Sequence, residues 1–251
     1  MKGRGALRLG VATSLTGRYA PFGLQVAEGL RCYVRDVSSG AGIRPELLLE
    51  DDRGDPRTLR ERLRKLVRED RVDLLFGPYG SGLTLVAAET ASALGVILWN
   101  HGGASDEIHE RFPRWCVGVL SPASTYLATV LEMVDTVAPP LRRVALVHAE
   151  TGFGAEIARG VLEWAARRRC TVFRRSYRSG DSTAVETAAA ELLAEPVDVV
   201  LGAGRFEDDL ALAEALWRLR PKTRAVALVA AGIDRFREAL DERAEGFLAP
   251  S

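Results

Sequence analysis

The sequence predicts an α/β protein with two Rossmann-like lobes, each built on a parallel sheet. Short apolar runs alternate with segments of helical periodicity along the whole chain, and this alternation occurs as two successive series. Strands that alternate with helices of this length form parallel sheets with right-handed crossovers. The clearest unit is 72–84, where an apolar run leads into a turn with three glycines and then into a helical segment that extends to about Leu94.

The first series is expected to form an N-terminal lobe over residues 1–120. Val26, Leu30 and Tyr33 recur at helical spacing, which predicts an amphipathic helix over 24–37. The apolar runs are short and rich in large residues, as is typical of buried parallel strands. The strands expected in this lobe are 7–12, 46–50, 72–76, 96–99 and 115–120.

Three carboxylates lie within five residues at Asp51, Asp52 and Asp55. Such a cluster suggests either a metal site or the start of a helix. The second interpretation is favoured, because Asp is a preferred N-cap residue and Pro56 suits the first helical position.

The second series begins after a break at 121–124 and is expected to form a second lobe over 121–248. It repeats the alternation of the first lobe. Its expected strands are 143–148, 171–177, 197–202, 225–229 and one that starts near 246, and its expected helices are 124–137, 154–168, 183–194, 207–219 and 235–240.

Composition and charge exclude several classes of protein. The 251 residues contain 34 basic and 34 acidic side chains, so the totals show no electrostatic footprint for nucleic acid. The three cysteines and three histidines are scattered and show no metal-ligand spacing. No apolar run reaches transmembrane length, and the first residues contain no apolar signal-peptide core.

Two of the glycine-rich turns fit phosphate-binding motifs in part. The stretch from Gly77 to Thr84 fits a P-loop except that Leu83 stands where lysine is required, which excludes a nucleotide triphosphatase. The stretch that starts at Gly202 fits a dinucleotide fingerprint only weakly, because Glu207 stands at the last glycine position.

The strand-end loops predict where a ligand would bind, because ligands of such sheets lie outside the carboxyl ends of the strands. With two lobes, these loops are expected to face each other across a cleft. They offer backbone amides, small hydroxyls and aromatic rings, without a catalytic triad or a paired metal motif. We therefore expect a protein that holds a small polar molecule, with no catalytic residue, no metal and no cofactor. The candidate ligand-binding residues are Tyr19, Phe22, Ser81, Gly82, Gly103, Ala104, Ser105, Phe153, Arg205 and Asp234.

Six stretches occur in an order that resembles one family. They are Leu-Thr-Gly (15–17) with Phe-Gly (22–23), Asp-Asp-Arg-Gly-Asp-Pro (51–56), Gly-Pro-Tyr-Gly-Ser (77–81), Asn-His-Gly-Gly-Ala-Ser (100–105), Gly-Phe-Gly (152–154) and Ala-Glu-Gly (244–246). This ordered set resembles the type I periplasmic binding proteins, in the branched-chain amino-acid (Leu/Ile/Val) receptor branch.

The resemblance implies two hinged lobes that close on a ligand and deliver it to an ABC transporter permease. It implies that Ser81 and Gly82 hold the ligand carboxylate, with backbone and hydroxyl contacts from 103–105. It also implies that Phe22 packs on the ligand side chain and that Phe153 is the aromatic contact of the second lobe.

The chain departs from the family pattern in three ways. Ala231 stands where an acid is expected to pair with the ligand ammonium, and Asp234 is the alternative acid. Arg205 replaces an expected aromatic residue. These two departures predict a small carboxylate, an aromatic acid or an amide as ligand. Family members are also longer, so 249–251 is expected to start a crossover back to the first lobe, with the C-terminal part of the fold lacking.

Three functions were compared. The first is a solute-binding receptor that captures a small amino acid or a related small carboxylate or amide between the two lobes for uptake. The resemblance places such a receptor in the periplasm or elsewhere outside the cytoplasm. The second is a ligand-sensing regulatory domain of the same fold, located in the cytoplasm and contacting a partner protein. The third is an enzyme on a doubly wound fold, which is disfavoured because no catalytic group is recognisable.

Overall fold

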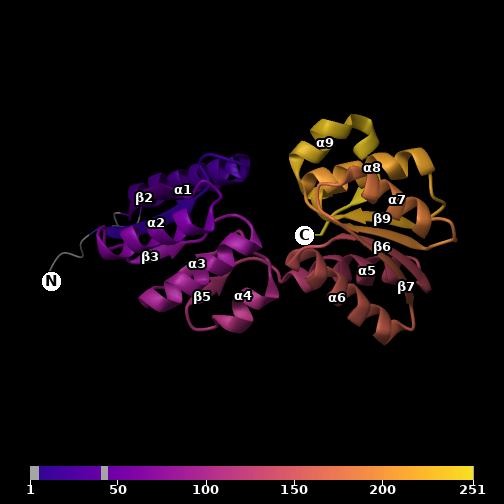
Figure 1. The fold of residues 1–251 in the computed structure, drawn as a ribbon, viewed down its shortest axis with the longest axis horizontal. Coiled ribbons are helices and arrows are strands. Elements are labelled where there is room, and N and C mark those ends of the chain that lie inside the picture. Colours follow the sequence, from indigo (N-terminus) through magenta and orange to yellow (C-terminus); the bar gives the residue numbers. More distant parts are fainter. Residues whose placement is uncertain (1–5, 41–44, 251) are drawn as a thin grey trace. The chain divides into compact units, whose positions relative to one another are not determined.

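The computed structural model describes residues 6–40 and 45–250. The chain divides into two compact units, Met1–Ser121 and Pro122–Ser251, called here the N-terminal and the C-terminal unit (Figure 1). Each unit is an α/β layer structure of its own, and each is described separately below.

The N-terminal unit contains a parallel sheet with the strand order β2-β1-β3-β4-β5 among its described residues. Helices α2, α3 and α4 pack side by side, whereas α1 contacts β1 and β2. The connections β1-α1-β2 and β2-α2-β3 run in opposite directions along the sheet. Because both crossovers are right-handed, their helices lie on opposite faces, so α1 covers the face opposite to α2, α3 and α4. The elements are β1 Leu7–Thr13, α1 Ala20–Gly40, β2 Pro45–Asp51, α2 Pro56–Arg68, β3 Leu74–Phe76, α3 Ser81–Leu94, β4 Leu98–Asn100, α4 Asp106–Arg111 and β5 Cys116–Gly118.

The start of α2 confirms the structural interpretation of Asp55. Its carboxylate accepts hydrogen bonds from the Thr58 backbone N–H at 2.8 Å and from the Thr58 hydroxyl at 2.9 Å, and Pro56 is the first helical residue. The short helix α4, by contrast, was not expected from the sequence. It is only six residues long, so it carries too little periodicity to be recognised.

The C-terminal unit repeats this topology. Its parallel sheet has the order β10-β9-β8-β6-β7, so in both sheets the strands, numbered from the first of each unit, follow the order 2-1-3-4-5. The elements are η1 Ala123–Thr125, α5 Tyr126–Val137, β6 Arg143–Ala149, α6 Gly152–Arg168, β7 Thr171–Tyr177, α7 Ser182–Leu192, β8 Val199–Ala203, α8 Phe206–Leu219, β9 Ala225–Leu228, η2 Val229–Gly232, α9 Asp234–Leu240, η3 Asp241–Ala244 and β10 Phe247–Leu248.

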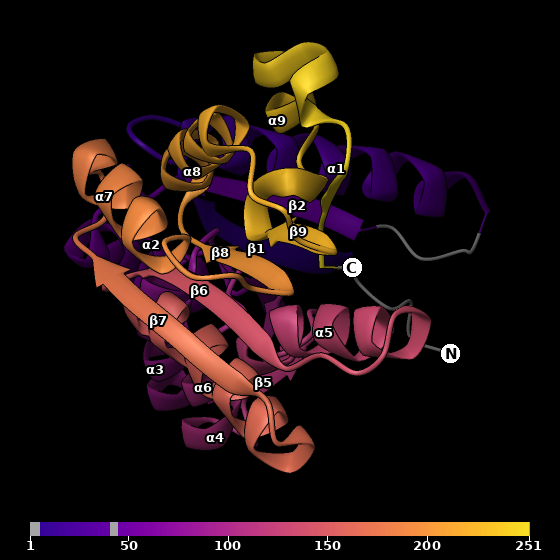
Figure 2. The ribbon, with the colours of Figure 1, turned by 90° about the vertical axis from the view of Figure 1, so that its right-hand side faces the viewer.

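Helices cover both faces of the C-terminal sheet. Helices α5 and α6 pack together on one face, and α7 and α8 pack together on the other (Figure 2). Strands β6 and β8 are buried between them, with a continuous buried run over Val144–Ala149 of β6, whereas β7 at the sheet edge is partly exposed. Burial on both faces explains why β8 contains no polar residue instead of an alternating pattern.

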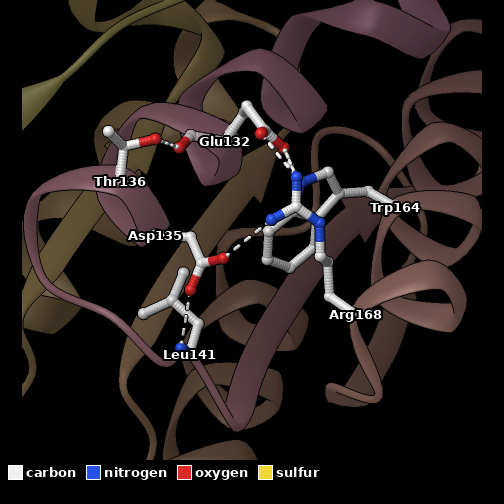
Figure 3. Close-up of polar contacts among 6 residues, drawn as sticks. All are labelled: Glu132, Asp135, Thr136, Leu141, Trp164 and Arg168. Atoms are coloured by element: carbon white, nitrogen blue, oxygen red, sulfur yellow. Dashed lines mark hydrogen bonds and ion pairs between the residues drawn. The ribbon is translucent and has the colours of Figure 1, made fainter.

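A polar network joins α5 to α6 at the edge of this layer (Figure 3). Glu132 accepts hydrogen bonds from the Trp164 indole N–H at 2.8 Å and from the Arg168 guanidinium. Asp135 pairs with the same guanidinium at 3.1 Å, and its other oxygen accepts from the Leu141 backbone N–H at 2.9 Å. The network therefore ties both helices to the segment that enters β6.

Within the described residues, every helix is too short or too polar to cross a membrane.

The packing of α6 on η1 allows a stability prediction. A Cβ at Gly160 would lie 1.7 Å from the Ser124 carbonyl oxygen, whereas a Cβ at Gly152 would meet no described atom within 4 Å. We expect Gly160→Ala to lower the free energy of unfolding by about 2 kcal/mol or more, because backbone cannot yield as a side chain can. Gly152→Ala, in the same helix, is the matched control and is expected to be neutral. Urea unfolding of both variants checks this, and equal midpoints would contradict it.

Candidate functional site

In each sheet the direction of winding reverses between the first and the third strand. In the N-terminal unit these are β1 and β3, which pair directly. At such a switch point the loops after the two strands diverge and leave a crevice for a ligand. The loops that border this crevice are 14–19 and 77–80.

An aromatic cluster lines these two loops. The Phe22 ring stacks on the Tyr79 ring with centroids 4.1 Å apart and planes 7° apart, and the Tyr19 centroid lies 6.1 Å from that of Tyr79. The structure thus brings Tyr19 and Phe22 together, as part of one aromatic surface. Tyr79 was not among the predicted site residues, although its place inside the Gly-Pro-Tyr-Gly turn is a signal that could have identified it.

The first turn of α3 follows shortly after Tyr79 in the sequence, and it contacts the loop after β4. Gly80, the N-cap of α3, has a φ of +94° and no side chain that could accept from the first N–H groups of the helix. The Ser105 backbone N–H donates to the Ser81 hydroxyl oxygen at 3.2 Å, and the Gly80 N–H donates to the Gly102 carbonyl at 2.8 Å. The predicted residues Ser81 and Ser105 are therefore in direct contact, and Gly82 is exposed next to them.

The loop after β4 is held by Asn100, a residue that the sequence analysis did not single out. Its buried side-chain oxygen accepts from the Gly103 N–H at 2.8 Å, and its nitrogen donates to the Gly103 carbonyl at 2.6 Å. A Cβ at Gly103 would lie 2.5 Å from the Cβ of Thr84, so this position has no room for a side chain. Asn100 and Thr84 together fix the backbone that presents Ala104 and Ser105, both of which are buried.

Two adjacent carboxylates hold the loop after β1. Asp51 accepts from the backbone N–H groups of Leu15 and Thr16, at 2.9 and 3.2 Å. Asp52 is fully buried and accepts from the Ser14 hydroxyl at 2.6 Å. Burial raises the pKa of Asp52 above its usual value. These residues position the segment that leads to Tyr19.

The candidates of the C-terminal unit lie at the starts of three helices. Phe153 is half-buried in the first turn of α6, and its ring meets the Tyr126 ring edge-on with centroids 5.8 Å apart. Arg205 is the exposed N-cap residue of α8, and Asp234 is the exposed first residue of α9. No hydrogen bond, ion pair or ring contact joins these three side chains within the part of the chain that the structure describes.

The C-terminal unit also contains a buried carboxylate, Asp209, which is not among the site residues predicted from the sequence. It is fully buried, and its two oxygens accept from the backbone N–H groups of Gly204 and Ala230, both at 2.8 Å. Burial raises the pKa of Asp209 to about 7, and the neighbouring Asp208 carboxylate acts in the same direction. The backbone hydrogen bonds lower the pKa but do not offset the effect of burial. Acidic residues in the first turn of a helix are usually explained by the helix dipole, so the sequence carried no sign of this bridging role.

No group of three His, Cys, Asp or Glu side chains is placed to hold a metal ion anywhere in residues 6–40 and 45–250. A groove of about 310 Å³ lies between α2 and α3, lined by Arg60, Arg64, Arg68 and the end of α3. It contains none of the strand-end residues described above.

Comparison with known proteins identifies the family. The family model described as periplasmic binding protein matches residues 6–250. The chain belongs to this family. The resemblance to this family and the fold class expected from the sequence are therefore confirmed.

Individual relatives are distant. Leu/Ile/Val-binding protein homolog 7 of Brucella abortus (strain 2308) is 24% identical over 162 residues, which cover 61% of this chain and 41% of that relative. A structure from Brucella ovis, of a leucine-, isoleucine-, valine-, threonine- and alanine-binding protein in a closed conformation, has a TM-score of 0.87 at 17% identity and covers 97% of this chain and 65% of its own.

A third protein differs in its ligand. The structure of a solute binding protein of an ABC transporter from Rhodopseudomonas palustris BisB5, in complex with 3,4-dihydroxybenzoic acid, has a TM-score of 0.74 at 15% identity and covers 89% of this chain and 61% of its own. At these identities the structures show a shared fold. This chain spans only part of the length of each of the three proteins.

The role of Asn100 predicts a stability loss. Asn100→Ala would leave the buried N–H and carbonyl groups of Gly103 without their partner, at a cost of about 1–3 kcal/mol for each unsatisfied group. We expect a lower free energy of unfolding and faster amide hydrogen exchange at Gly103. Gln25→Ala, which removes an exposed amide from α1, is the control. Unchanged exchange at Gly103 would refute the assigned role.

The raised pKa of Asp209 predicts a pH dependence of stability. With a pKa of about 7 in the folded state and 3.8 as its ordinary value, the folded state binds one more proton between pH 4 and 7. The free energy of unfolding should therefore fall as pH rises through this window, by up to about 1.4 kcal/mol per unit from this group. Urea unfolding at pH 5 to 8 should show a smaller slope for Asp209→Asn than for the wild type or for Glu207→Gln. Identical slopes would contradict the prediction.

Proposed function

We propose that this chain is the ligand-capturing part of an extracytoplasmic receptor that delivers a small carboxylate to an ABC transporter permease. The observation that carries the proposal is the geometry around the start of α3. The first turn of this helix begins at a glycine N-cap, and the Ser81 hydroxyl beside it meets the loop that ends at Ser105.

This geometry suits a carboxylate for electrostatic reasons. The first N–H groups of a helix have no intrahelical acceptor, and the helix dipole favours negative charge at the same end. A bound carboxylate would accept from these N–H groups and from the Ser81 hydroxyl. The residues proposed for this role are Ser81, Gly82 and the 103–105 loop.

The aromatic surface of Tyr19, Phe22 and Tyr79 supports a flat or apolar ligand body. A stacked pair such as Phe22 and Tyr79 offers a broad face on which an aromatic ring or aliphatic chain can pack. Receptors of this kind usually combine such a wall with a few polar groups that fix orientation.

The ligand proposed is an aromatic or other small acid without an obligatory ammonium group. Ala231, in η2, has no charge to offer an ammonium, and the nearby Asp234 is exposed. Arg205 adds a cation at the start of α8. The Rhodopseudomonas palustris neighbour, whose structure holds 3,4-dihydroxybenzoic acid, supports the choice of aromatic acids as first probes.

A thermal-shift screen tests the ligand class. We expect benzoate-type acids to raise the melting midpoint of the chain, because a ligand that binds only the folded state stabilises it by mass action. Leucine and amides form the comparison set. Binding of leucine with an absolute need for its ammonium group would overturn the ligand class, and turnover of any probe would overturn the receptor proposal.

The carboxylate site is tested by substitution of Ser81. Ser81→Ala removes a hydroxyl donor to a charged group, a hydrogen bond worth about 1.5–3 kcal/mol, so the Kd of an acid that binds in the screen should rise about ten- to a hundredfold. Ser92→Ala, near the other end of α3, is the matched control and should leave the Kd unchanged. Titration calorimetry measures both, and equal affinities would place the carboxylate elsewhere.

A further inference from the structure

Two adjacent carboxylates are buried in the first turn of α8. The exposed fraction is 3% for Asp208 and zero for Asp209. Neither forms an ion pair with any residue in the described ranges. Buried carboxylates without a cation are costly, and they persist where hydrogen bonds compensate the lost hydration. Their hydrogen-bond partners lie in the loops that follow β7, β8 and β9.

Asp208 holds the loop after β7. It accepts from the Ser179 hydroxyl and the Gly180 N–H, both at 2.7 Å, and from the Arg205 N–H at 3.2 Å. The loop after β7 is thereby joined to the start of α8.

Asp209 joins the loops after β8 and β9 through the N–H groups of Gly204 and Ala230. A Cβ at Gly204 would lie 2.3 Å from the Tyr177 hydroxyl and 2.8 Å from the Asp209 carboxylate. The backbone at Gly204 therefore lies in close contact with both side chains, so the position of the loop depends on them.

The two loops carry candidate ligand contacts. Arg205 directly follows Gly204, and Ala230 opens the segment that runs through Ala231 to Asp234. We propose that Asp209 is a positioning residue for ligand binding, which fixes the ends of β8 and β9 so that these loops keep one arrangement. This inference rests on the proposed receptor function.

The protonation state of Asp209 should affect this role. An ionised carboxylate offers both oxygens as acceptors, whereas a protonated one gives up part of this capacity. The titratable groups that face it are Asp208 on α8 and Tyr177 on β7. Burial and the two carboxylates raise the pKa of Tyr177, so the phenol remains protonated. Asp209 is thus the group that changes charge near neutral pH.

The affinity experiment compares Asp209→Asn with Glu207→Gln, which removes an exposed carboxylate from the same helical turn. The probes are 3,4-dihydroxybenzoate and leucine, titrated into the full chain at pH 6, 7 and 8. We expect the wild type and Glu207→Gln to bind more tightly, by a fewfold, at pH 8 than at pH 6. Asp209→Asn should bind at least tenfold more weakly at pH 8, with a flat pH profile. A folded Asp209→Asn variant with wild-type affinity and pH profile would overturn the inference.

A measurement without ligand separates this inference from the receptor function. The amide resonances of Gly204 and Ala230 in the wild type should titrate together with one midpoint near neutral pH, while that of Gly152 should not. If neither probe binds the wild type, the proposed ligand class fails, and the amide titration alone decides the role of Asp209. Absence of a joint titration would overturn that role, including in the case that Asp209→Asn does not fold.

Discussion

The structure depends on how the backbone N–H groups at the carboxyl ends of its parallel strands are satisfied. All strands of a parallel sheet end at the same edge. The backbone N–H groups of the loops that follow no longer have a neighbouring strand as hydrogen-bond partner. Buried N–H groups without acceptors are costly, so nearby side chains must supply them. Buried or half-buried Asp and Asn side chains do this in both units, and they are Asp51, Asp52, Asn100, Asp208 and Asp209.

In two of the strand-end loops, a glycine lets the backbone come close to a neighbouring side chain. Gly103 can approach Thr84 and Gly204 can approach Tyr177 because neither carries a Cβ. In the N-terminal unit Ser81 is half-buried and Gly82 is exposed, and the rings of Phe22 and Tyr79 are stacked. Preorganised groups of this kind lower the entropic cost of binding, which is what a receptor requires.

The departures from the family pattern lie in the C-terminal unit, at Ala231 and Arg205. The buried carboxylates beneath them act on the backbone, so the charge of Asp209 is not available to a ligand ammonium. The exposed groups near these positions carry both signs of charge, since Arg205, Glu207 and Asp234 are all exposed.

The sequence by itself determined the fold class, nearly every helix and strand, and the helix start at Asp55, because apolar periodicity and turn chemistry are local properties. It also indicated that Tyr19 and Ser105 belong to strand-end loops, whereas the structure places Phe22 and Ser81 in the first turns of α1 and α3. Only the tertiary structure decided which residues hold those loops. Asn100 and Asp209 look unremarkable in sequence, since an amide after a strand and an acid in a first helical turn each have common local explanations. Asp209 and Tyr79 contact Ala230 and Phe22, which the pairing of distant strands brings within reach. Asn100 bonds to Gly103 in its own loop, so its role depends on the conformation of that loop.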